Sequence, residues 1–355
     1  MHTHGVKYIG SKNKLIPHIL HATKHIPPST MIDVFTGTTR VAQAYRKSGW
    51  KVYTSDLNWA SEAYAHLFLM NDRAQLQALE PYVERLNKLS GEADWITKYY
   101  CDAKAVKGTN LIKVWKPKNG IRADAIRNQI QQWEESEEIS HHTAMSLTAL
   151  LILALDAVDS TVGQQQAYLK DWSSRSDHDL VLKIPDDIHE GIRGEHQVGN
   201  SLELEYPKAT LAYLDPPYSA HSYATYYHIW DSITRWDKPE VALETNRRID
   251  RTKEQMDEYM RSEWNSKSTV YNAFEELIDR LPVEYILLSY SNESLLTLEQ
   301  LRTILDKYTY TIQEIDYKRN IMSQIGNASL YQRDVITKNI EYLILIEKGG
   351  DESSA

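Results

Sequence analysis

The chain contains a single cysteine, Cys101, so it cannot form an internal disulfide bond, and such cysteine usage is typical of the cytosol. Long apolar runs are also missing, because the longest, residues 149–155, is far too short to cross a bilayer. Residues 1–5 lack the apolar core of a signal peptide. We therefore expect a globular cytoplasmic protein without a membrane-spanning segment, and 355 residues with 42% hydrophobic residues suffice for a full core.

Positive charge is scarce overall, because 40 Lys and Arg stand against 49 Asp and Glu, which gives a formal net charge of −9. That balance argues against nucleic acid as a partner, since phosphates are bound by positive surface. The distribution differs from the sum, because residues 98–127 hold eight basic and only two acidic residues. This basic stretch is either a solvated helical face or a surface for phosphates.

Glycine is missing where a dinucleotide-binding loop would need it. Residues 30–47 read as a strand, a turn and a helix, which is how a doubly wound α/β fold begins. The dinucleotide fingerprint has three glycines in this turn, whereas the chain has only Gly37. A second strand over 51–55 ends at Asp56, and an acid there commonly accepts ribose hydroxyls. The residues predict a site for an adenosine-like ligand without a diphosphate and disfavour a dinucleotide oxidoreductase.

The chain does contain a specific turn, Asp215-Pro216-Pro217-Tyr218, after the apolar strand 211–214. Two consecutive prolines fix the backbone and remove two N–H donors, which leaves carbonyls free to accept hydrogen bonds. A carboxylate, a free carbonyl and an aromatic ring at the carboxyl end of a strand suit a flat molecule that carries an amino group. A nucleobase flipped out of the helix is such a molecule. Asp-Pro is also ordinary turn chemistry, but these four residues together rarely arise by chance.

The region between the two halves of the expected sheet changes character. Long polar helical patterns and one apolar helix over 144–155 replace the alternation of strands and helices. Further on, residues 308–315 and 341–347 read as an antiparallel pair of strands. We expect an α/β fold with a mostly parallel, doubly wound, Rossmann-like sheet, an antiparallel end and a helical insertion. The expected division is a catalytic domain over 1–70 and 200–348, a target-recognition insertion over 71–199 and a flexible tail over 349–355.

In content and order, these motifs resemble the Dam-like, alpha-group DNA adenine methyltransferases. The resemblance rests on residues 8–12 (Tyr-Ile-Gly-Ser-Lys), 33–37 (Asp-Val-Phe-Thr-Gly), Asp56 and the turn at Asp215, and covers roughly 5–70 and 200–347. It implies site-specific transfer of a methyl group from S-adenosylmethionine to the amino group of adenine in duplex DNA, by base flipping. It also implies a restriction–modification or related system, with any endonuclease encoded separately.

Carried onto this sequence, the resemblance assigns three groups of residues. The catalytic group is Asp215, Pro216, Pro217 and Tyr218. The cofactor group is Tyr8, Lys12, Asp33, Phe35, Gly37, Thr38, Thr39, Asp56, Leu57, Asn200 and Asp215. The DNA-binding group, which combines the basic stretch with two later segments, is Lys113, Lys116, Lys118, Arg122, His221, Tyr223, Tyr226, Lys318 and Arg319. Two positions depart from the family, because Thr39 stands where a second glycine is common and Asn200 where an acid is usual.

The expected chemistry follows from adenine itself, whose amino lone pair is delocalised into the ring. If the Asp215 carboxylate and the Pro216 carbonyl each accept one amino hydrogen, the lone pair becomes available, while Tyr218 stacks on the base. No metal is expected, since His221 and His228 have no third ligand nearby. The alternatives are an enzyme of the same fold acting on cytosine, RNA or a protein glutamine, and a catalytically silent binding protein. An aspartate at the start of the turn favours adenine, and a basic insertion favours DNA.

Overall fold

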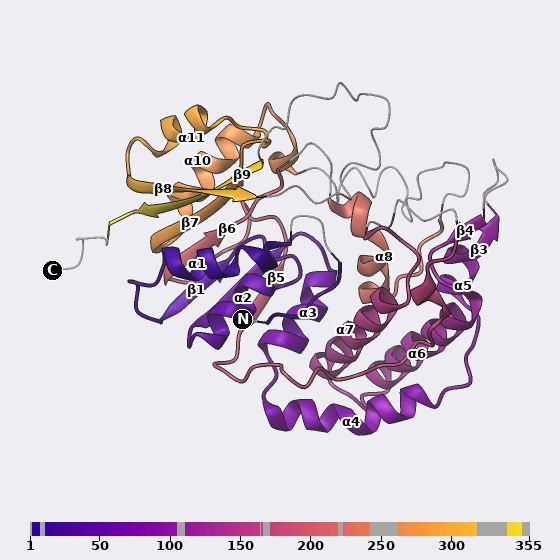
Figure 1. Cartoon of the computed structure of the whole chain (residues 1–355). Coiled ribbons are helices and arrows are strands. Elements are labelled where there is room, and N and C mark those ends of the chain that lie inside the picture. The colour runs from indigo at the N-terminus through magenta and orange to yellow at the C-terminus, as the bar shows by residue number, and fades with distance from the viewer. Residues whose placement is uncertain are drawn as a thin grey trace.

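A seven-stranded mixed sheet organises the chain. The computed structural model describes residues 2–7, 11–104, 111–163, 165, 171–218, 223–241, 262–317 and 339–349. The strands of the sheet are β1 (Thr30–Asp33), β2 (Lys51–Asp56), β5 (Glu195–Val198), β6 (Ala209–Leu214), β7 (Val283–Ser291), β8 (Thr309–Tyr317) and β9 (Asn339–Glu347). Their order is β5-β2-β1-β6-β7-β9-β8 (Figure 1). The first five of these are parallel, whereas β9 is antiparallel to both β7 and β8. This confirms the predicted fold class and its antiparallel end.

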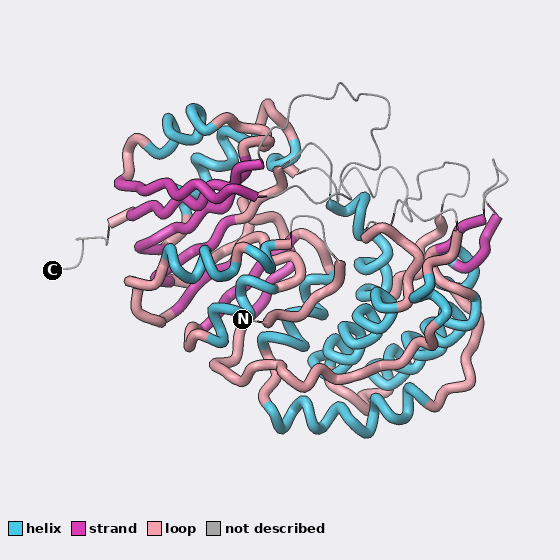
Figure 2. The backbone as a smooth tube through the Cα atoms, viewed as in Figure 1, coloured by secondary structure: helices cyan, strands magenta, loops and turns pink. Residues whose placement is uncertain are grey.

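Helices cover both faces of the sheet, and a second group of helices stands beside it (Figure 2). The flanking elements are η1 (Lys12–Lys14), α1 (Ile16–Ala22), α2 (Arg40–Lys47), α3 (Ala60–Leu69), η3 (Glu263–Asn265), α10 (Val270–Arg280) and α11 (Leu298–Leu305). The helical lobe contains α4 (Arg73–Asn87), α5 (Trp95–Tyr100), α6 (Pro117–Glu135), α7 (His141–Ala157), η2 (Ser174–Asp177), α8 (Tyr223–Arg235) and a hairpin of β3 (Cys101–Lys104) and β4 (Leu111–Lys113).

Alternate residues of the central strands point to opposite faces of the sheet, and each face has its own core. Met31, Leu211 and Leu287 belong to the core that contains α2 and α3. Their neighbours Ile32 and Ala212 belong to the core that contains α10 and α11. Because both faces are covered, the central strands are mostly apolar on both faces, as expected for buried parallel strands. Polar residues gather at the ends of these strands, where a site can form.

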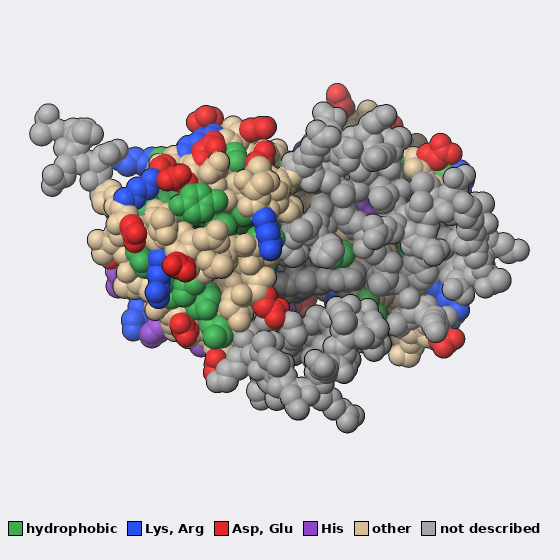
Figure 3. Space-filling view, turned by 90° about the horizontal axis from the view of Figure 1, so that it is seen from above, with side chains coloured by type: hydrophobic (Ala, Val, Ile, Leu, Met, Phe, Trp, Pro, Cys, Tyr) green, Lys and Arg blue, Asp and Glu red, His purple; other side chains and the backbone are tan. Residues whose placement is uncertain are grey.

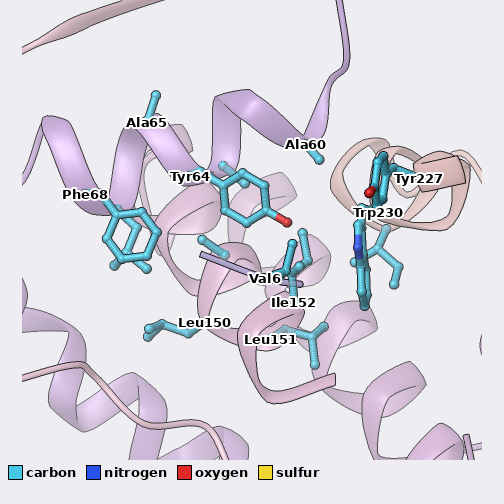
Figure 4. Packing of buried hydrophobic residues seen from close by; sticks show 14 of the residues in the cluster. Val6, Ala60, Tyr64, Ala65, Phe68, Leu150, Leu151, Ile152, Tyr227 and Trp230 are labelled. Atoms are coloured by element: carbon cyan, nitrogen blue, oxygen red, sulfur yellow. The ribbon is translucent and has the colours of Figure 1, made fainter. Parts of the chain in front are cut away.

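The helical lobe is joined to the sheet by one continuous core. In Figure 4, Tyr64 and Phe68 of α3 face Leu150 and Ile152 of α7, with Trp230 of α8 beside them. The first turn of α7 is capped by its preceding serine, whose Oγ accepts the Thr143 N–H at 3.2 Å. The apolar helix predicted over 144–155 is thus the inner helix of the lobe.

The boundaries of the predicted insertion need two corrections. The expected end at residue 199 is too late, because β5 already pairs in parallel with β2 and is the edge strand of the sheet. The second predicted catalytic segment, 200–348, also contains α8, but this helix packs in the lobe. There the buried Arg127 side chain donates to the Ile233 carbonyl at 2.8 Å and the Thr234 carbonyl at 3.0 Å. The lobe therefore draws on chain from both sides of the catalytic turn.

Asn-Gly is a common turn sequence, yet Asn119 and Gly120 lie in the first turn of α6. A Cβ atom on Gly120 would stand 2.2 Å from the Cys101 Sγ, so only glycine lets α6 approach the β3 strand this closely. Asn119 accepts from the Leu180 N–H at 3.0 Å and donates to the His178 carbonyl at 2.9 Å. Tertiary contacts thus override the turn preference. No helix in the described ranges has the length and apolar character needed to span a membrane.

Candidate active site

Three parallel strands, β1, β2 and β6, end in acids at one edge of the sheet. Asp33 ends β1, Asp56 ends β2 and Asp215 directly follows β6. A pocket of about 1040 Å³ opens at this edge, which is where open α/β sheets bind ligands. It is lined by Ser11, Lys12, Asp33, Val34, Phe35, Thr36, Gly37, Thr38, Arg40, Val41, Asp56, Leu57, Asn58, Gly199, Asn200, Ser201, Tyr213, Asp215, Pro217, Tyr218, Ser262, Trp264 and Asn265.

Nine of the eleven predicted cofactor residues thus line one pocket. Of the other two, Tyr8 lies outside the described residues. Thr39 is fully buried beneath the loop, where its hydroxyl accepts the Gln43 Nε2–H at 3.0 Å, so it shapes the turn and does not face the pocket. Of the catalytic turn, Pro217 and Tyr218 join Asp215 in the lining, and Pro216 is buried.

The loop between β1 and α2 is held to β2 through Asp56. Gly37 has φ +52°, a left-handed conformation that glycine adopts without strain, and its N–H donates to Asp56 Oδ2 at 2.8 Å. The other oxygen of Asp56 accepts from the Asn58 N–H at 2.9 Å and the Asn58 amide at 3.0 Å. Burial raises the pKa of Asp56, and these hydrogen bonds oppose that rise. The two strand ends are thereby fixed side by side.

Asp33 is a buried acid with one unpaired oxygen. Only 1% of the residue is exposed, and burial raises its pKa to about 7, an effect that the negative charges of Asp215 and Asp56 reinforce. The Thr36 hydroxyl donates to Oδ2 at 2.9 Å, whereas Oδ1 has no hydrogen-bond partner among the described residues. An unpaired buried carboxylate oxygen in a pocket wall is costly, and a cationic ligand would satisfy it.

Asp215 belongs to a cluster of four polar side chains that the chain brings together from distant segments. Lys12 Nζ lies 3.0 Å from Asp215 Oδ1, and the Tyr218 hydroxyl donates to the same oxygen at 2.8 Å. Tyr218 also contacts Glu341 Oε2 at 3.2 Å, and Lys12 Nζ lies 3.8 Å from Glu341 Oε1. Within the described part of the chain, Asp215 Oδ2 has no such partner.

Two opposing effects act on the pKa values of the acids in this cluster, namely burial and the attraction of Lys12. Burial raises the pKa of Asp215, while the Lys12 ammonium and the Tyr218 hydroxyl lower it. Burial likewise raises the pKa of Glu341, and Lys12 opposes that rise. One lysine therefore serves two acids, and its closer contact is with Asp215. Lys12 and Tyr218 thus favour the charged form of Asp215 against the effect of burial.

The sequence did not identify Glu341 or Trp264 as part of the site. Glu341 of β9 pairs opposite Ser291 of β7, and β7 in turn lies next to β6, the strand that leads into the catalytic turn. Trp264 packs edge-on against Phe35 at 4.9 Å and donates from Nε1 to Ser201 Oγ at 2.9 Å. An acid that opens a terminal strand was a usable signal for Glu341. No motif surrounds Trp264, and its place depends on tertiary packing alone.

The Tyr218 ring is engaged in this structure. Lys12 Nζ lies 4.4 Å from its centroid, and Tyr290 packs edge-on at 5.5 Å. Because the ring already has these contacts, a flipped base would have to stack on the exposed part of Tyr218; this stacking stays a prediction. Asn200, the second departure from the family, lines the pocket and accepts the Leu202 N–H at 3.1 Å.

None of the described residues in the predicted DNA-binding group lines the pocket, and two of its lysines are paired with acids. Lys116 bonds to Asp177, and Lys118 lies 2.6 Å from Asp179. Arg122 donates to three backbone carbonyls, which makes it a structural residue of the lobe. On the described surface in Figure 3, basic and acidic side chains are interspersed.

The remaining members of that group have fewer described contacts. Lys113 Nζ lies 6.0 Å from the Trp172 ring centroid. Tyr226 is half-buried in α8, next to Tyr227. His221, Lys318 and Arg319 lie outside the described residues, as does the side chain of Tyr223, the first residue of α8.

Comparison with known proteins adds independent evidence. The family model described as D12 class N6 adenine-specific DNA methyltransferase matches residues 8–304. The chain is 29% identical over 354 residues to Type II methyltransferase M.NlaIII of Neisseria lactamica, covering 97% of this chain and 99% of that protein. It is 28% identical to Modification methylase StsI of Streptococcus sanguinis and 26% identical to Modification methylase LlaI of Lactococcus lactis subsp. lactis. It spans about half of each of these two, 51% and 56% of their lengths.

Proposed function

The chain belongs to the D12 class N6 adenine-specific DNA methyltransferases, and from this premise we propose that the pocket holds S-adenosylmethionine and presents Asp215 to a flipped adenine. The enzyme transfers a methyl group to adenine in DNA and therefore uses a methyl-donor cofactor. The observation that carries the proposal is the state of Asp215, whose Oδ1 is anchored by Lys12 and Tyr218 while Oδ2 remains without a partner among the described residues.

The pocket suits the proposed cofactor in the charge and the chemical character of its lining. S-adenosylmethionine would supply an activated methyl group on a positively charged sulfonium. Three carboxylates, Asp33, Asp56 and Asp215, line the pocket, and the unpaired Oδ1 of Asp33 can pair with a cationic group. Asp56 would accept ribose hydroxyls with the lone pairs that its backbone contacts leave unused. Phe35 and Trp264 provide apolar wall for a purine ring.

Asp215 and the following proline would act on the target base. Oδ2 accepts one amino hydrogen of adenine, and the Pro216 carbonyl accepts the other, which frees the nitrogen lone pair for attack. Lys12 and Tyr218 hold Oδ1 in place, so the carboxylate needs no reorientation when the base arrives. Glu341 anchors Lys12 and Tyr218 from behind. Catalysis then comes from fixed dipoles and positioning.

We further propose that the helical lobe is the target-recognition region and that the enzyme modifies a defined site. We take this region to include α8, which packs in the lobe, and to end before β5, which pairs with β2 in the sheet. Lys113, Lys116 and Lys118 would contact phosphates. Lys116 and Lys118 would first leave Asp177 and Asp179, with which they form surface ion pairs of small energy. Because the similar proteins are named as Type II methyltransferases or modification methylases, we place the enzyme in a restriction–modification system with a separate endonuclease.

The test is transfer of a tritiated methyl group from S-adenosylmethionine to duplex DNA of mixed sequence. Lys12→Met removes the charge that anchors Asp215 and is expected to lower incorporation at least tenfold, since a charged hydrogen bond is worth about 1.5–3 kcal/mol. Lys14→Met, in the same turn but exposed, is the matched control and should retain activity. Equal incorporation by the two variants would contradict the role given to Lys12.

A further inference from the structure

A cluster of histidines and glutamates lies outside the pocket, where three helices meet. Glu62 and His66 are one turn apart on α3, so both side chains lie on the same face. His141 and His142 begin α7, and Glu134 stands near the end of α6. Figure 1 shows these helices next to one another at the junction of the sheet and the lobe. The methyl-transfer chemistry uses none of these five side chains.

The geometry of three members suits a metal ion. One ligating atom each from Glu62, His66 and His141 lies within 4.8 Å of the other two. His141 Nε2 and Glu62 Oε1 are 3.3 Å apart. Zinc bonds of about 2.0–2.2 Å in a tetrahedron place neighbouring ligand atoms about 3.3–3.6 Å apart. Two of the three ligand atoms therefore already have the spacing of a zinc site.

His141 is oriented by a second carboxylate. Its Nδ1 lies 2.7 Å from Glu134 Oε1, so Nδ1–H donates to that acid and Nε2 is directed to Glu62. A histidine whose other nitrogen donates to a carboxylate is the usual arrangement around zinc, because the carboxylate fixes the ring and increases the basicity of the ligating nitrogen. Glu134 would thus be an outer partner and Glu62 a direct ligand.

A chain of hydrogen bonds fixes the tautomer of His66. The Asn71 amide nitrogen donates to the His66 carbonyl at 2.8 Å and to Ser146 Oγ at 3.0 Å, so Asn71 Oδ1 is the acceptor for His142 Nε2–H at 2.9 Å. His142 Nδ1 then carries a lone pair and accepts from His66 Nδ1–H at 2.7 Å. With the proton on Nδ1, the lone pair of the His66 ring is on Nε2, which we take as the ligating atom.

We propose that Glu62, His66 and His141 form a Zn²⁺ site with water as the fourth ligand. Two imidazoles and a carboxylate are a ligand set that zinc accepts, and three protein ligands leave one position open. On binding, zinc replaces the proton that His141 Nε2 shares with Glu62, and that proton goes to solvent. The 56% exposed side chain of His141 gives the ion access. The site would tie α3, which flanks the sheet, to α7 of the lobe.

The experiment is calorimetric titration of the full chain with ZnCl₂ after removal of metals by chelator. We expect one saturable site per chain, and a rise in melting temperature on zinc addition. His141→Gln and Glu62→Gln should each weaken binding at least tenfold. Glu134→Gln keeps all three ligands and should weaken it by about 10–100-fold, as loss of an outer partner does. A merely structural glutamate at 134 would leave zinc affinity unchanged.

Two further variants separate this site from adventitious binding. His18→Ala removes an exposed histidine on α1 and should leave the titration unchanged. Asp187→Asn disrupts a second group, in which Asp187 contacts His2 at 2.9 Å and His4 at 2.6 Å. Zinc binding that survives Glu62→Gln and His141→Gln, or that is lost in Asp187→Asn, would overturn the proposal, as would a wild-type chain that binds no zinc. Circular dichroism of each variant excludes loss of fold as the cause.

Discussion

Asp33→Asn is expected to separate stability from cofactor binding. The substitution keeps the shape of the side chain and an acceptor for the Thr36 hydroxyl, but it removes the charge. A carboxyl whose pKa moves from 3.8 to about 7 on folding opposes folding, when charged, by up to about 4 kcal/mol, since one pKa unit corresponds to about 1.4 kcal/mol. The new amide hydrogens lack acceptors, and this costs about 1–3 kcal/mol, which offsets part of the gain in stability. The cofactor-free variant should therefore unfold at a higher urea concentration.

The effect has a defined pH dependence. Because the folded-state pKa of Asp33 is above its unfolded value, the folded protein holds this proton more tightly between pH 3.8 and about 7. The wild-type free energy of unfolding is therefore unaffected by Asp33 below pH 3.8 and falls as the pH rises towards 7. The advantage of Asp33→Asn over the wild type should accordingly grow from pH 4 to pH 7 and then level off.

Cofactor binding should change in the opposite direction. If Asp33 Oδ1 pairs with a cationic group, loss of the charge should weaken S-adenosylmethionine binding by about 1.5–3 kcal/mol, or 10–150-fold. Urea unfolding at several pH values and calorimetric titration with S-adenosylmethionine measure the two effects. A variant that binds the cofactor as the wild type does, or one with lower stability at pH 8, would refute the reasoning for Asp33.

Three other substitutions test separate parts of the structure. Gly37→Ala introduces a side chain at φ +52° and should destabilise the loop by about 1–2 kcal/mol, with a matching loss of cofactor affinity; unchanged calorimetric affinity would contradict this. Arg127→Met leaves two carbonyls of α8 unpaired and should lower the free energy of unfolding by about 2–4 kcal/mol in urea, whereas an unchanged midpoint would show that the contact contributes little. Lys116→Ala with Lys118→Ala should reduce the slope of log affinity for DNA against log salt by about 1.8 if both contact phosphates, and an unchanged slope would remove them from the DNA surface.

Local signals in the sequence were sufficient for the sheet edge. An acid after each apolar strand, a glycine turn and the Asp215-Pro216 pair specify where strands end, and parallel strands bring those ends together. The pocket accordingly contains Asp33, Asp56 and Asp215. The strand-like character of residues 308–315 and 341–347 also predicted an antiparallel terminal pair.

Long-range packing decided what the sequence could not. The Asn119-Gly120 pair is part of a helix, and the Cys101 Sγ occupies the space that a Cβ atom on Gly120 would need. Lys116, which reads as a phosphate contact, is paired with an acid some sixty residues away, and Glu341 reaches the site only through strand order. Partners so far apart in the sequence cannot be paired from local patterns, and their contacts are seen only in the folded chain.

The most direct measurement is the identity of the methylated nucleoside. Duplex DNA is incubated with S-adenosylmethionine and the enzyme, digested, and analysed by mass spectrometry, with Asp215→Asn as the comparison, since it keeps the shape of the side chain and loses the charge beside Lys12. We expect N6-methyladenine from the wild type and a loss of at least a hundredfold in the variant, with S-adenosylmethionine binding retained within tenfold. Methyladenine at undiminished rate from Asp215→Asn would contradict the role of this carboxylate.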